Sequence, residues 1–171
     1  MKRILFIGLI SILSSNACHH GNDVSNDPQS QKSLAQDELE ITNLIRDYAE
    51  SINNADAVMG SSLFAHTAEV TFIHPRGHEK GWEQINSSIY KFFGDTFSNR
   101  DLKTLNEKVT IYNNTAWAEF YWIFDATFNS DSTPLQTRGR ETQIWRKSDG
   151  QWQIVHIHYS GMPVTVEREG S

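Results

Sequence analysis

The sequence contains a single cysteine, and this scarcity excludes several classes of protein. Cys18 has no partner in the chain, so an intramolecular disulfide and a cysteine-based metal or redox centre are excluded. Runs of lysine and arginine are also lacking, and the formal net charge is −6 with histidine neutral. A chain with this charge pattern offers no basic patch for phosphates, so nucleic acid is not expected as a partner.

Long apolar runs are lacking as well. The apolar run at residues 4–13 is only about half as long as a helix that crosses a bilayer. A basic pair, Lys2-Arg3, precedes it, and the triplet Ser15-Asn16-Ala17 follows with small residues at its first and third places. This order is typical of a secretory signal peptide. We therefore expect residues 1–17 to be a signal peptide and the protein to be exported to the periplasm.

The sequence leaves two outcomes of this export open. Cleavage after Ala17 makes Cys18 the first mature residue, as in a bacterial lipoprotein, and a lipid on that thiol would be the chain's contact with the membrane. Ser15 stands where such lipoprotein signals usually carry leucine. Cleavage by the ordinary signal peptidase would instead release a soluble periplasmic protein.

The next segments predict a tether and then helices. Residues 18–35 are polar and have too few apolar side chains to fold, so a disordered tether is expected before one domain over residues 36–168. From Gln36, apolar residues recur at helical spacing and predict a helix that ends at Asn53-Asn54. Asp56 fits the N-cap of a short second helix. A third helix is expected from Gly81 to about Phe97.

The remaining sequence is typical of β-structure. Val70–His74 predicts a short strand that Pro75 and Gly77 stop. Further strands are predicted at residues 101–112, 115–128, 137–147 and 151–160. Tight turns at Asn113-Asn114 and Ser148-Asp149-Gly150 join them in pairs. This order of elements predicts an α+β fold in which the helices pack on one face of a curved, mainly antiparallel sheet.

Five stretches form a pattern shared with a known domain: Ile52–Asp56, Gly81-Trp82, Glu141–Trp145, Asp149–Gln153 and Val155–Gly161. The pattern resembles the association domain of calcium/calmodulin-dependent protein kinase II. The chain is thereby identified as a member of the nuclear transport factor 2-like superfamily, which includes ketosteroid isomerase and SnoaL-like cyclases. The resemblance implies a cone-shaped roll with a pocket open at one end, and a homodimer formed through the outer face of the sheet. Kinase motifs are missing, so no kinase activity is implied.

The resemblance to ketosteroid isomerase implies candidate catalytic residues at the positions that match its catalytic groups. Tyr48 lies in the matching stretch of the first helix, and His74, before Pro75, falls where that enzyme has its base. Tyr48 can donate a hydrogen bond to an oxyanion, and histidine titrates near neutral pH. Gln143 falls where the enzyme has a second acid, so its two-carboxylate arrangement is lost and steroid isomerisation is not expected. The alternative stays open that Tyr48 is a core residue without a catalytic role and that His74 is a hydrogen-bonded residue of the turn.

The resemblance also implies which side chains line the pocket. The expected pocket residues are Arg76, Trp82, Tyr121, Asp125, Gln143 and Tyr159. Strand alternation then puts Trp122 and Phe124 on the outer face of the sheet, where their apolar surface needs burial in a dimer. The opposite assignment of the two faces stays open.

A cationic pocket of the association-domain type is not implied. Its arginines fall here on Ile123, Gln143 and Tyr159, none of which is basic. Arg76, near the expected mouth, either replaces that charge or is an ordinary surface arginine. His156 and His158 alternate on the last strand and could share a metal, but no third ligand is evident. We expect neither a metal nor a cofactor.

Three functions are compatible with the sequence. The first is a homodimer that binds a small, largely apolar ligand. The second is an isomerase, cyclase or hydro-lyase that works by proton transfer with His74 and Tyr48. The third is a non-catalytic oligomerisation module.

Overall fold

The computed structural model describes residues 28–162 of the chain. The expected signal peptide, Cys18 and residues 163–168 of the expected domain lie outside this range. Within it, no helix is both long and apolar enough to span a membrane.

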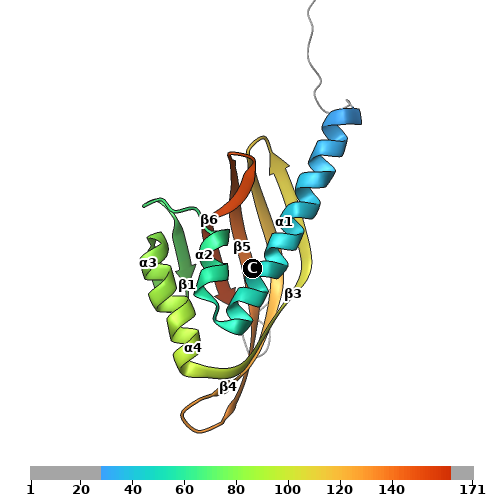
Figure 1. Cartoon of the computed structure of the whole chain (residues 1–171). Coiled ribbons are helices and arrows are strands. Elements are labelled where there is room, and N and C mark those ends of the chain that lie inside the picture. Colours follow the sequence, from blue (N-terminus) through green and yellow to red (C-terminus); the bar gives the residue numbers. More distant parts are fainter. Residues whose placement is uncertain (1–27, 163–171) are drawn as a thin grey trace, which may run out of the picture.

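The structure begins with a helix where a tether was expected. Helix α1 covers Pro28–Asn54, so residues 28–35 are helical and the boundary between tether and domain moves toward the N-terminus. Proline suits the first turn of a helix because its fixed φ is already helical and its missing N–H is not needed there. Figure 1 shows these first turns extending past the edge of the sheet. Residues 31–36 are exposed, so polarity alone did not prevent the helix.

The other elements follow in the expected order. They are α2 (Ala57–Leu63), β1 (Thr71–His74), β2 (Gly77–Lys80), α3 (Gly81–Ile85), the π-helical η2 (Asn86–Lys91), α4 (Phe92–Thr96), β3 (Phe97–Tyr112), β4 (Thr115–Phe128), β5 (Pro134–Ser148) and β6 (Gln151–Gly161). The expected N-cap is confirmed, because the Asp56 carboxylate accepts hydrogen bonds from the N–H groups of Val58 and Met59 at 2.9 Å each. The expected third helix is present as the consecutive segments α3, η2 and α4.

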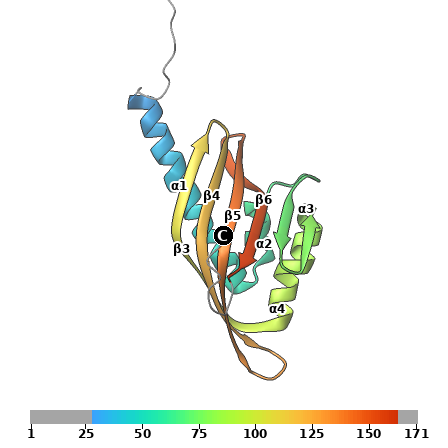
Figure 2. The same ribbon diagram turned by 180° about the vertical axis from the view of Figure 1, so that it is seen from behind.

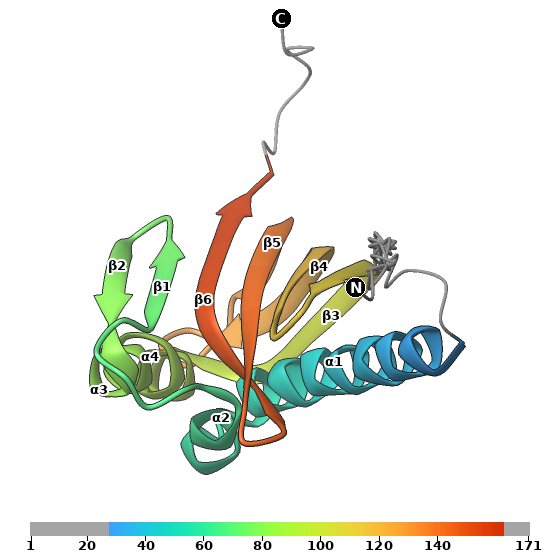
Figure 3. The same cartoon turned by 90° about the horizontal axis from the view of Figure 1, so that it is seen from above.

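Six strands form one curved sheet in the order β2-β1-β6-β5-β4-β3. All neighbouring strands are antiparallel except β1 and β6, which are parallel. Strand β2 was not predicted, because it is a four-residue polar strand at the edge of the sheet and carries no apolar alternation. Figures 2 and 3 show the β1–β2 hairpin beside β6 and the helices on one face of the sheet. The α+β roll is therefore confirmed.

Strand β4 shows which face of the sheet is covered. Its even-numbered residues are buried: Ala116, Ala118, Phe120, Trp122, Phe124 and Ala126. Tyr121 is 40% exposed and Asp125 shares its face, so the predicted assignment of the two faces is wrong. That assignment was transferred from the position of Ile123 in the association domain. The unbroken apolar row on the even positions is the stronger signal, because the helices cover the apolar side of a sheet.

Candidate functional site

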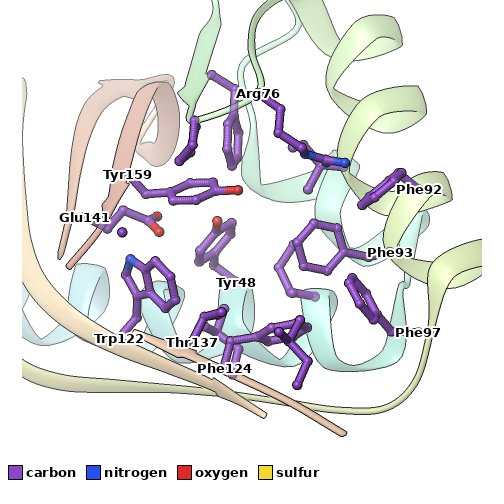
Figure 4. A pocket seen from close by; sticks show the side chains of 17 residues that line it. Tyr48, Arg76, Phe92, Phe93, Phe97, Trp122, Phe124, Thr137, Glu141 and Tyr159 are labelled. Atoms are coloured by element: carbon purple, nitrogen blue, oxygen red, sulfur yellow. The ribbon is translucent and has the colours of Figure 1, made fainter. Parts of the chain in front are cut away.

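A cavity of about 370 Å³ lies between the helices and the inner face of the sheet. This volume falls within the range of small-molecule sites, roughly 300–1,000 Å³. Much of its wall is aromatic and comes from Phe72, Phe92, Phe93, Phe97, Trp122 and Phe124. Figure 4 shows the rings of Phe92, Phe93, Phe97, Trp122 and Phe124 around the space, from elements far apart in the sequence.

The aromatic wall is built by edge-to-face contacts. The ring of Phe93 lies 5.6 Å from that of Phe97 and 5.3 Å from that of Phe124. On the opposite side, Tyr159 meets Trp122 at 5.6 Å with the rings at 90°. Such contacts are favourable beyond the area that they bury, because the positive ring edge meets the negative ring face. The cavity is therefore held open by rings that support one another.

Polar groups gather at one end of this apolar space. Tyr48 from α1, Glu141 from β5 and Tyr159 from β6 line the cavity, and Figure 4 shows their oxygen atoms close to one another. Tyr48 is 2% exposed and Glu141 5% exposed, so this is the buried end. Gln143 lies behind Glu141 and donates a 2.8 Å hydrogen bond from its Nε2 to Oε1 of the carboxyl.

Burial determines the protonation of these groups. It raises the pKa of Glu141 to about 8, although hydrogen bonds from Gln143 and Tyr48 act in the opposite direction. Burial, followed by the nearby Glu141, also raises the pKa of Tyr48 well above its ordinary value. Burial raises the pKa of Tyr159 to about 12, against the effect of Arg76. At pH 7 the inner end therefore presents mostly neutral O–H groups, which can donate hydrogen bonds.

Glu141 was not among the predicted site residues. The sequence analysis placed Gln143 in the position of the second acid, but the carboxyl on the cavity is two residues earlier. Both side chains point inward, because Gly139, Glu141, Gln143 and Trp145 are all buried. A glutamate in phase with a buried tryptophan on the inner face was the signal that could have identified it.

Four of the six predicted pocket residues do not line the cavity, and among them only Gln143 lies directly behind the lining. Trp82 packs instead on Phe64 and Tyr90, with ring centroids 5.6 and 5.4 Å apart. Tyr121 and Asp125 lie on the outer face: Arg140 sits 5.3 Å over the Tyr121 ring, and Asp125 accepts a hydrogen bond from Gln136. The expected place of Tyr121 and Asp125 in the pocket followed from the wrong assignment of the two faces of the sheet.

The other predicted residues cluster around the cavity. Tyr48, Arg76 and Tyr159 line it, and Gln143 supports Glu141 from behind. Arg76 comes from the turn between β1 and β2, which also supplies Pro75 to the lining. Whether any of these side chains acts on a ligand stays a prediction.

His74 is buried next to the cavity but does not line it. Its Nδ1 accepts a 3.4 Å hydrogen bond from the backbone N–H of Arg76, so Nε2 carries the proton of the neutral ring and donates to Glu79 at 3.1 Å. The imidazole also stacks on Tyr159, with centroids 6.0 Å apart. Both ring nitrogens are engaged, so the geometry makes His74 a support for Tyr159 and for the turn.

The histidines of β6 lie apart from this site. Nδ1 of His156 pairs with the hydroxyl of Thr71 at 2.6 Å, and His158 is exposed. Burial, and then the nearby His158 and His78, lower the pKa of His156. Within residues 28–162, no three His, Cys, Asp or Glu side chains are grouped as a metal site requires.

Comparison with known proteins identifies the fold and its family. The model of the SnoaL-like domain matches residues 41–165. A nuclear transport factor 2-like superfamily protein from Salmonella enterica serovar Typhimurium is 42% identical, with a TM-score of 0.74 over 82% of this chain and 99% of that one. A Streptomyces avermitilis structure described as "a putative dehydratase from the NTF2-like family" is 15% identical, with a TM-score of 0.68 over 77% and 99% of the two chains. The finer likeness to the kinase association domain stays a prediction.

Replacing Glu141 by glutamine should change how stability depends on pH. With a pKa of about 8 in the fold and an ordinary value near 4.5 in the unfolded chain, Glu141 binds more proton when folded between these values. The free energy of unfolding therefore falls as pH rises from about 5 to about 8 and levels off above, by on the order of a few kcal/mol. Glu141→Gln removes this pH-dependent component. The free energy of unfolding of the variant, relative to that of wild type, should therefore increase as pH rises from about 5 to about 8.

Urea unfolding at pH 5, 6.5 and 8 measures this difference. The matched control is Glu119→Gln, which removes an exposed carboxylate of the outer face and should follow the wild-type profile. Parallel profiles for wild type and Glu141→Gln would show that the carboxyl titrates as in the unfolded chain.

Proposed function

The chain belongs to the SnoaL-like family, within the nuclear transport factor 2-like superfamily, and from this we propose that it is an exported homodimer that binds a small, largely apolar molecule in its cavity. Tyr48 and Glu141 hold an oxygen atom of that molecule at the buried end. The apolar body of the ligand lies along the aromatic wall.

One observation carries this proposal: a cavity with mostly apolar walls has two neutral hydrogen-bond donors at its buried end. A ligand oxygen can accept from the protonated Glu141 and from Tyr48, whose O–H then turns from Glu141 to the ligand, and both bonds form away from competing water. A ketone, enol or phenol has such an oxygen next to an apolar ring system. A purely polar ligand would lose its hydration along the phenylalanine wall without replacement.

Removing one donor should weaken the binding of a simple probe. We use 2-naphthol, whose hydroxyl oxygen can accept from Tyr48 and whose rings fit an apolar wall. Tyr48→Phe keeps the ring and removes the hydroxyl, so we expect its Kd to rise about tenfold, which corresponds to one hydrogen bond of roughly 1.4 kcal/mol. Isothermal titration calorimetry at pH 7 measures the change.

Tyr121→Phe is the matched control, because it removes a tyrosine hydroxyl from the outer face. It should bind 2-naphthol as wild type does. An unchanged Kd for Tyr48→Phe, or an equal loss in both variants, would contradict the assigned position of the ligand oxygen.

A proton-transfer enzyme is the second candidate, and the pKa of Glu141 favours it. A carboxyl that titrates at about 8 is present in both protonated and ionised forms near neutral pH, as a general acid–base group requires. Its carboxylate form can take the proton next to a ligand carbonyl, while Tyr48 donates to the enolate oxygen. His74, which was predicted as the base, is held by Glu79 and the Arg76 backbone, so Glu141 takes that role in this candidate.

Exchange of α-protons in a model ketone tests this second candidate. If Glu141 is the base, the protein should accelerate exchange of 2-tetralone protons in heavy water, as followed by NMR. The rate should rise with pH up to about 8, because the ionised fraction of Glu141 rises over that range. Glu141→Gln should lower the accelerated rate about a hundredfold or more, and His74→Gln much less. If wild type does not accelerate the exchange, the enzyme candidate is excluded and ligand binding is the function that is left.

The homodimer is proposed to form through the outer face of the sheet. Trp117 and Tyr121 on β4 and Leu105 on β3 are 38%, 40% and 42% exposed there. Large side chains of this kind are enriched at the centres of protein interfaces. Trp122 and Phe124, the residues first assigned to this interface, belong to the interior instead.

A charge on this face should separate the protomers. Trp117→Glu introduces an unpaired carboxylate into the expected interface, so sedimentation velocity should show a monomer where wild type is a dimer. Val58→Glu is the control, since Val58 is 83% exposed on α2 and lies away from the sheet surface. A dimer that persists with Trp117→Glu would exclude this face as the interface. Dimers that bind no 2-naphthol would favour the third function, an oligomerisation module.

A further inference from the structure

We propose that the cavity is built for an amphipathic anion, a ring compound whose carboxylate is bound by Arg76 at the mouth. This inference rests on the proposed binding function and adds the charge of the ligand. It depends on the position of Arg76, on its partners, and on the distribution of charge along the cavity.

Arg76 is held in place over the opening. It lies in the turn between β1 and β2 and lines the cavity together with Pro75. Its backbone N–H is fixed by Nδ1 of His74, and its guanidinium lies 3.6 Å from the ring centroid of Phe92. Figure 4 shows the side chain running along one edge of the cavity toward that ring. A cation stacked in this way loses little conformational entropy when it binds an anion.

The described part of the chain provides no counter-ion for this guanidinium. Across residues 28–162, Arg76 forms neither an ion pair nor a side-chain hydrogen bond. Glu79, the acid of the same hairpin, faces His74. Asp95, on the neighbouring helical segment, pairs with Lys91. The donors of Arg76 therefore stay available for an outside group, and a planar guanidinium suits the two oxygens of a carboxylate.

The rest of the cavity carries no charge to oppose an anion. Glu141 is the acidic residue of the lining, and it is mostly protonated at pH 7. The field of Arg76 reaches Tyr159, whose pKa it lowers against the effect of burial. Arg76 is thus the one charged group among the described residues of the lining at pH 7, although the whole chain has a net charge of −6. A general attraction of the protein for anions is excluded by that net charge, so the preference is local to the cavity.

The three regions define the chemical class of the ligand. An oxygen of the ligand meets Tyr48 and Glu141 at the buried end, an apolar ring system lies along the phenylalanines, and a carboxylate reaches Arg76 at the mouth. A hydroxy- or oxo-acid built on fused rings has these features in this order. A neutral molecule of the same shape would leave the guanidinium without a partner.

A pair of probes that differ in charge alone tests the inference. We compare 6-hydroxy-2-naphthoate with 6-hydroxy-2-naphthamide by isothermal titration calorimetry at pH 7. Wild type should bind the acid about tenfold more tightly than the amide, and added salt should reduce this ratio because the charge pair lies near the surface. In Arg76→Gln the ratio should fall to about one, while the Kd of the amide stays within about twofold of wild type. Arg138→Gln, which removes an exposed arginine of β5, should keep the wild-type ratio.

Each outcome separates this inference from the function on which it rests. Equal binding of acid and amide by wild type overturns the inference and leaves the proposed function in place. A preference for the acid that survives in Arg76→Gln overturns it as well, because the charge would then be bound elsewhere. If neither probe binds, the proposed function fails, and the inference fails with it. Binding of the amide by Arg76→Gln also shows that this variant is folded.

Discussion

A curved sheet that its helices cover only in part is the constraint on which the rest of the structure depends. Irregular pairing bends four of the strands: the register shifts twice between β3 and β4, and once between β5 and β6. Such bulges increase local twist and curl a sheet. The helices close over the concave side, and residues from eight helices and strands and from the β1–β2 turn meet around the remaining space. Aromatic rings coat this space without filling it. The fold therefore gives up packing contacts that a tight core would have, and a ligand can restore them.

The buried end of this space carries the larger electrostatic cost. An ionised Glu141 would be stranded among apolar rings, so the folded protein holds it as an acid. Two further polar atoms near it, Oε1 of Gln143 and Nε1 of Trp122, have no hydrogen-bond partner in the described part of the chain. Leaving such an atom unpaired costs roughly 1–3 kcal/mol. Nε1 of Trp145 is a third such atom. Only Trp122 among these residues lines the cavity, so a ligand could reach that atom but not the other two.

Sequence reasoning identified the elements better than the site. Helical spacing predicted an apolar stripe on α1, formed by Leu39, Ile41, Leu44, Ile45, Tyr48 and Ile52. Four of these six are buried and Leu44 is partly buried, but Leu39 is 53% exposed. The turn at Asn113-Asn114 predicted the β3–β4 hairpin, since asparagine tolerates the positive φ of 53° that Asn113 adopts. Alternation along β4 separated two faces correctly but could not say which one the helices cover. That information belongs to the packing of distant segments, and a borrowed alignment assigned it wrongly.

Glu141 was missed for a related reason. A glutamate next to an arginine on a strand is typical of an exposed ion-pair ladder, and Arg140 and Thr142, the neighbours of Glu141, do lie on the outer face. Glu141 alternates with these neighbours along the strand, so its side chain points to the inner face of the sheet. Its protonation follows from the low polarity of the groups that surround it. Single-sequence patterns report periodicity, whereas a shifted pKa depends on everything packed around the group. The chemistry of this site therefore became visible only with the fold.

The irregular third helix explains how the mouth and the wall of the cavity are joined. The π-helical segment η2 adds a residue to the turn before Phe92, so the helix that follows is rotated relative to an unbroken α-helix. Ile89, Phe92 and Phe93 all line the cavity from this segment and its continuation. Phe92 in turn carries the guanidinium of Arg76, which the turn between β1 and β2 supplies. An unbroken helix would move Phe92 away from this position, and Arg76 would lose the ring that aligns it. The charge at the mouth and the apolar wall thus depend on the same local departure from α-helical geometry.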